Sequence, residues 1–97
     1  MVIRIPTPRY QPDVVLRRAG YTPFRDPRSG EDSYVRRTGT HFYPRFHVYV
    51  QFEGTALRIN LHLDQKQPSY HGFSKHAGEY DGAVVEAEAE RLYQALQ

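Results

Sequence analysis

The sequence predicts an α+β fold of two layers, in which an antiparallel sheet of three to four strands carries two helices on one face, in the order α-β-β-β-α. Residues 45–64 alternate between apolar and polar side chains, which is typical of a half-buried strand pair. Residues 12–19 and 82–97 instead repeat their apolar side chains at helical spacing. A chain of 97 residues has the length of one domain, so we expect residues 1–97 to fold as a single unit.

The hairpin within residues 45–64 has the clearest pattern. Its apolar residues are Phe46, Val48, Val50 and Phe52 in the first segment and Leu57, Ile59, Leu61 and Leu63 in the second. A turn at Gly54 and Thr55 pairs residues whose numbers sum to 109, which places all eight side chains on one face. A slip of one residue would set apolar side chains against polar ones, so burial favours this register.

Two helices are expected on the apolar face of the sheet. Pro12 and Asp13 suit the opening turn of a helix that continues through DVVLRRA and ends at Gly20. Its apolar residues are Val15, Leu16 and Ala19. In the segment GAVVEAEAERLYQALQ the apolar residues Val85, Ala89, Leu92 and Leu96 follow the spacing i, i+4, i+7 and i+11. Each stripe needs an apolar surface to pack against.

The remaining segments carry weaker signals. Residues 1–11 contain two prolines and are expected to form an extended arm, with a short edge strand at residues 2–5. Residues 21–24 and 33–37 are expected to add further strands. Residues 65–80 lack a clear period, and connections of this length are usually functional or disordered. Because this segment contains three aromatic residues, we expect an ordered loop held against the body of the domain.

Composition excludes several classes of protein. The chain has no cysteine, which excludes disulfides, thiolate metal sites and cysteine nucleophiles. It has no apolar run of the roughly 18 residues that span a bilayer, and its first residues do not resemble a signal peptide, so we expect a cytoplasmic protein without a membrane partner. Residues 1–50 hold nine arginines against four acidic residues, a net charge of +5. Residues 51–97 hold four basic and seven acidic residues, a net charge of −3, so the first half is the part that would attract a polyanion.

The register that buries the apolar face also determines the polar face. It sets His47 opposite His62 and Arg45 opposite Asp64, with Cβ atoms about 4.5–5.5 Å apart. Two imidazoles at that separation can share a zinc-like divalent ion, for which residues 65–80 offer His76 and Glu79 as further ligands. The alternative is that both histidines are polar residues on a solvated strand face.

Part of the chain resembles the small HicA toxins, which have a double-stranded-RNA-binding-type fold. The segments concerned are LRRAGY at residues 16–21, the triplet Gly39-Thr40-His41, and INLHL at residues 59–63. The resemblance covers roughly residues 12–64. It implies RNA binding or cleavage, with His41 in the catalytic position of the family.

Three functions therefore remain open. The first is an RNA-binding module, in which arginines meet phosphate and tyrosines stack on bases. Its expected contact residues are Arg17, Arg18, Arg36, Arg37, Arg45, Arg58, Tyr43 and Tyr49. The second is a metal-binding protein or metal-assisted hydrolase at His47 and His62. The third is an accessory protein without enzymatic activity that docks a protein partner. The sequence leans away from an enzyme and leaves the oligomeric state open.

Overall fold

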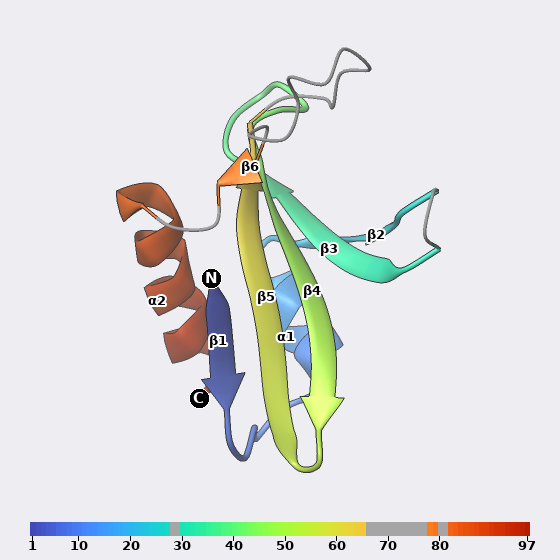
Figure 1. The fold of residues 1–97 in the computed structure, drawn as a ribbon, viewed down its shortest axis with the longest axis vertical. Coiled ribbons are helices and arrows are strands. Elements are labelled where there is room, and N and C mark those ends of the chain that lie inside the picture. Colours follow the sequence, from blue (N-terminus) through green and yellow to red (C-terminus); the bar gives the residue numbers. More distant parts are fainter. Residues whose placement is uncertain (28–29, 66–77, 80–81) are drawn as a thin grey trace.

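The computed structural model describes residues 1–27, 30–65, 78–79 and 82–97. The elements follow one another along the chain as β1 (Val2–Ile5), α1 (Pro12–Arg18), β2 (Thr22–Arg25), β3 (Asp32–Arg37), β4 (Arg45–Glu53), β5 (Ala56–Asp64), β6 (Gly78–Glu79) and α2 (Ala83–Leu96). Figure 1 shows the long β4–β5 hairpin at the centre, with β1 and α2 on one side of it and β2 and β3 on the other.

The strands form one antiparallel sheet in the order β1-β5-β4-β3-β2, and β6 pairs with the end of β5. The predicted α+β class with two helices is confirmed. The sheet has more strands than the predicted three to four, because the short strands expected at residues 2–5 and 21–24 both join it, as β1 and β2 at its two edges. The N-terminal segment contributes β1, which pairs with residues 57–60 of β5. Two further backbone hydrogen bonds between Met1 and Leu61 extend this pairing to the first residue.

The predicted register of the hairpin is confirmed along its whole length. Phe46 pairs with Leu63, His47 with His62, and so on to Glu53 with Ala56. The turn places Gly54 at a φ of +63°, a conformation that glycine adopts without steric cost. Period-2 alternation and a two-residue turn together leave only one alignment that buries the apolar face.

The core lies between this face and both helices. Residues from the sheet and the helices form one buried cluster, namely Ile3, Ile5, Val15, Leu16, Tyr21, Phe46, Val48, Leu57, Ile59, Leu61, Leu63, Val85, Ala89, Leu92 and Leu96. Phe52 departs from the prediction, because its side chain is 54% exposed. Its cross-strand partner Leu57, by contrast, is fully buried.

A buried carboxylate ties α2 to the rest of the domain. Glu88 accepts hydrogen bonds from the Tyr21 hydroxyl at 2.6 Å, from Arg36 at 3.1 and 3.2 Å, and from Arg91 at 2.8 and 2.9 Å. Arg91 also donates to the carbonyl of Ala19 at 2.8 Å. Burial alone would raise the pKa of Glu88, but the hydrogen bonds from Arg91, Arg36 and Tyr21 outweigh it and hold this pKa below its usual range.

This cluster predicts how stability depends on pH. Because the pKa of Glu88 is lower in the folded state, its contribution is fully present above its unfolded pKa of about 4.3 and is lost as the pH falls through the lower folded value. Glu88→Gln is therefore expected to lower the free energy of unfolding by about 2 kcal/mol at pH 7, and by less at acidic pH. Urea denaturation at several pH values measures this difference. Glu86→Gln, on the exposed side of the same helix, is the control and should follow the wild type.

No helix of the described residues is both long and apolar enough to cross a membrane.

Candidate functional site

The open face of the sheet brings together the polar residues that the register predicts. The ring centroids of His47 and His62 lie 5.0 Å apart. Arg45 donates from its Nε atom to the carboxylate of Asp64 at 3.2 Å. All four residues stand at the β6 end of the β4–β5 hairpin, on the face opposite the core.

Two residues of this part of the open face are buried, whereas the alternative interpretation placed both histidines on a solvated strand face. Only 5% of Arg45 and 5% of His47 are exposed. The rings of Phe24, Phe42 and Tyr43 surround the guanidinium of Arg45 at 4.8, 4.5 and 4.8 Å from their centroids. Cation–π attraction of this kind gains strength where the cation is shielded from water. The Nη1 atom of Arg45 is buried without a hydrogen-bond partner.

His47 is held at both ring nitrogens. Its Nε2 atom lies 2.8 Å from the Ser33 hydroxyl, and its Nδ1 atom lies 3.1 Å from Oδ2 of Asp64. The Ser33 hydroxyl donates its single proton to the carbonyl of Phe24 at 2.9 Å. Since that proton is used, Nε2 of His47 must be the donor to Ser33. Nδ1 of His47 then faces the carboxylate of Asp64, which only accepts hydrogen bonds.

Asp64 contacts each of the three other polar residues of this cluster. It lies within hydrogen-bond distance of Arg45, of His47, and of His62, whose Nε2 atom is 2.8 Å from Oδ1. Burial by itself would raise the pKa of Asp64, but the hydrogen bonds and charges of the two histidines outweigh it and hold that pKa well below its usual range. Asp64 is therefore an anion throughout the physiological pH range.

His47, His62 and Asp64 form a group of potential metal ligands. One ligand atom from each residue can be chosen so that all three lie within 4.8 Å of one another. The sequence predicted the two histidines and placed their further ligands in residues 65–80. Among the described residues the third potential ligand is Asp64, on the strand that already carries His62. His76 lies outside the described residues. Glu79 pairs with Leu63 through its backbone in β6, and its side chain is outside the description.

Ser33, His47 and Asp64 are connected as in a serine hydrolase triad, yet they lack its accessibility. Ser33 is 1% exposed, and its hydroxyl proton is engaged by the backbone of Phe24. A substrate carbonyl cannot reach an oxygen buried in this way. The role of Ser33 in this structure is to orient the ring of His47, which is the role that a hydrogen-bond partner plays behind a metal-ligating histidine.

The arginines predicted to contact RNA are divided between the two faces. Arg17 pairs with Asp13 on α1 and Arg36 pairs with Glu88, both in the layer of the helices, where Arg18 also lies exposed. Arg37 lies over the ring of Phe42 on the open side, and Arg45 is buried there. These residues therefore do not converge on one surface.

The other predicted contact residues lie on the open side. The ring of Tyr43 packs on Arg45, and Tyr49 stacks on His47 with centroids 4.6 Å apart. Arg58 approaches Glu53 at 3.9 Å. His41, the residue that the HicA resemblance makes catalytic, is exposed in the connection between β3 and β4, and it is not a member of the His47 cluster.

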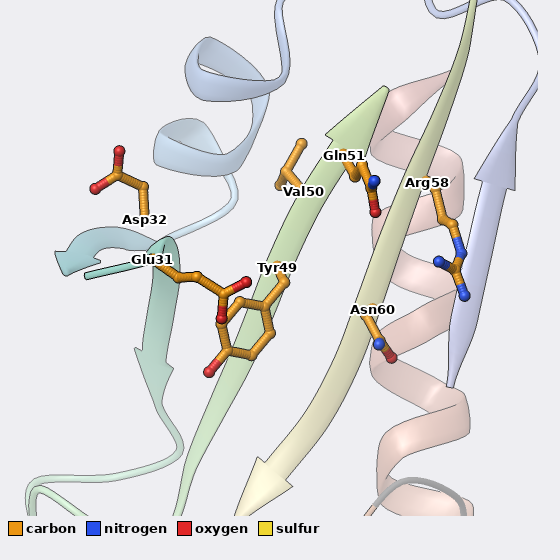
Figure 2. A pocket seen from close by; sticks show the side chains of 7 residues that line it. All are labelled: Glu31, Asp32, Tyr49, Val50, Gln51, Arg58 and Asn60. Atoms are coloured by element: carbon orange, nitrogen blue, oxygen red, sulfur yellow. The ribbon is translucent and has the colours of Figure 1, made fainter. Parts of the chain in front are cut away.

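A hollow of about 620 Å³ adjoins the cluster on the open face. Figure 2 shows the side chain of Glu31 reaching towards Tyr49 from just before β3, while the side chains of Tyr49, Gln51, Arg58 and Asn60 come from β4 and β5 and that of Asp32 points away from them. Because Tyr49 and Asn60 occupy the next polar pair after His47 and His62, the hollow and the cluster share Tyr49 as their boundary.

Fold and site together define a small α+β domain whose open sheet face carries a shielded His-His-Asp cluster beside a polar hollow. We found no match for this chain among protein-family models, curated proteins or solved structures. The resemblance to HicA toxins therefore remains a prediction from short sequence segments.

Two members of the network could not be found from the sequence pattern. Ser33 lies in a different strand from His47, and it reaches the ring because β3 pairs with β4 so that Val35 stands opposite His47. Phe24 belongs to β2, which covers the cluster from the side of β3. The connection of residues 38–44 has no turn signature that determines this pairing. The polar face of the hairpin was the only signal of the site in the sequence.

Proposed function

We propose that the protein binds a divalent metal ion of the zinc class through His47, His62 and Asp64. The supporting observation is the hydrogen-bond chain from the Phe24 carbonyl through Ser33 to Nε2 of His47, which leaves Nδ1 pointing at a carboxylate. One metal ion satisfies Nδ1 of His47, Nε2 of His62 and the Asp64 carboxylate together. Imidazole and carboxylate are donors that zinc accepts, and a fourth position would hold water.

Arg45 reduces the affinity expected for this ion. Its guanidinium shares Asp64 and places a positive charge beside the site. The carboxylate therefore brings little net negative charge to the metal, and binding should be weaker than at a site whose carboxylate has no other cation. The variant Arg45→Met replaces the cation with an apolar side chain that suits the three surrounding rings, and it is expected to bind the metal more tightly.

Zinc titration of untagged, metal-free protein tests the proposal. The wild type is expected to bind one equivalent of Zn²⁺ with release of protons, because the ligand nitrogens must be free of them. His62→Ala should weaken binding by at least tenfold, whereas His41→Ala, which removes an exposed imidazole elsewhere, should leave it unchanged. Wild-type protein that binds no zinc, or a His62→Ala variant that binds as well as the wild type, would contradict the proposal.

RNA binding and docking of a protein partner remain predictions from the sequence. Arg36 and Arg45 pair with Glu88 and Asp64, which reduces the number of arginines free to meet phosphate. RNA binding can be tested by titrating single-stranded RNA at several salt concentrations. The logarithm of the binding constant should fall linearly with the logarithm of the salt concentration, with a slope of about −0.7 for each phosphate contact. If the protein binds no RNA at low salt concentration, the prediction of RNA binding is wrong.

A further inference from the structure

The hollow beside Tyr49 has an unusual lining. Four of the side chains that line it, those of Glu31, Gln51, Arg58 and Asn60, end in a flat group with two or more polar atoms. The volume of about 620 Å³ falls in the range of about 300–1,000 Å³ that small-molecule sites occupy. Glu31, Gln51 and Asn60 are exposed, and Arg58 is partly exposed.

These flat groups match a particular ligand chemistry. Carboxylates only accept hydrogen bonds, the guanidinium only donates them, and the carboxamides of Gln51 and Asn60 do both. A pair of neighbouring hydroxyl groups requires this mixture, because each hydroxyl donates once and also accepts. Two polar atoms on one planar side chain are spaced to contact two adjacent hydroxyls at once. The lining is therefore complementary to a polyol.

Tyr49 adds an apolar surface at one end of the hollow. Its ring stacks on His47 and on His62, with interplanar angles of 27° and 21°. Both contacts come from the same neighbouring rung of the sheet, and Tyr49 also lines the hollow. An aromatic face of this kind packs well against the C–H side of a sugar ring.

The charges of the hollow argue against a phosphate. Glu31 provides a negative charge against the single positive charge of Arg58, which Glu53 also approaches. No net positive charge is left to hold a phosphate, whereas a neutral ligand needs none. We infer that the hollow binds a neutral sugar, with Tyr49 as the platform and the carboxamides of Gln51 and Asn60 as hydrogen-bonding partners. This inference does not depend on metal binding.

Titration of isotopically labelled protein, followed by two-dimensional amide NMR, tests the inference. The probes are glucose, galactose, N-acetylglucosamine and maltose, with inorganic phosphate and adenosine monophosphate for comparison. At least one sugar is expected to shift the amides of residues 49–51 and 58–60 in a saturable way. The dissociation constant should be millimolar, since a shallow exposed site gains little from each ligand atom.

Matched variants locate the binding. Gln51→Ala combined with Asn60→Ala is expected to weaken the sugar interaction by tenfold or more. Gln94→Ala, which removes an exposed carboxamide from α2, should leave it unchanged. Failure of every sugar in the panel, equal binding by the double variant, or tighter binding of either phosphate compound would overturn the inference.

Discussion

Asp64→Ala is expected to lower the free energy of unfolding by about 3 kcal/mol in metal-free protein. The substitution leaves Arg45 and His47, each about 5% exposed, without the carboxylate that faces them. Removing one partner of a buried ion pair costs about 3–5 kcal/mol, because the remaining charge stays in the low-dielectric interior. Asp64 is itself 20% exposed, which favours the lower end of that range. Urea denaturation with a chelator present measures the effect.

The control for this prediction removes the opposite charge. Arg45→Met places an apolar chain among the rings of Phe24, Phe42 and Tyr43, and it should cost less than Asp64→Ala. The double variant should lose less than the two single losses combined, since neither unpaired charge of the Arg45–Asp64 pair remains. If Asp64→Ala stays within about 1 kcal/mol of the wild type, the cluster does not behave as a buried ion pair.

Leu92→Ala is the second substitution with a large expected effect. Leu92 is fully buried within the core between α2 and the sheet. Truncation of a buried leucine costs about 2–5 kcal/mol, from lost apolar transfer and from the cavity left behind. A domain of this size is stable by about 5–15 kcal/mol, so the variant should unfold at a clearly lower urea concentration.

Val84→Ala provides a matched comparison on the same helix. Val84 is 55% exposed, so the loss of its methyl groups should change the free energy of unfolding by no more than about 0.5 kcal/mol. Similar losses in the two variants would mean that α2 does not pack on the sheet through Leu92.

Some features of these sites depend on residues that are close together in the sequence, and others depend on residues that are far apart. The β4–β5 register follows from residues adjacent in sequence, because alternation and the turn at Gly54 leave one alignment that buries Val48 and Leu61. The pairs His47–His62 and Arg45–Asp64 follow from the same register. The bounds of α1 are equally local, since Pro12 begins the helix and Gly20 follows its end at a φ of +100°.

The environment of those pairs depends on segments far from them in the chain. Ser33 and Phe24 reach His47 only because β2 and β3 add to the sheet beside β4. Phe52 is exposed although its cross-strand partner Leu57 is fully buried, a difference that the alternating pattern does not predict. The sequence by itself thus determined which side chains face each other across the hairpin. Only the tertiary structure decided that water is excluded from His47 and Arg45, because solvent exclusion requires side chains from several strands to meet in space.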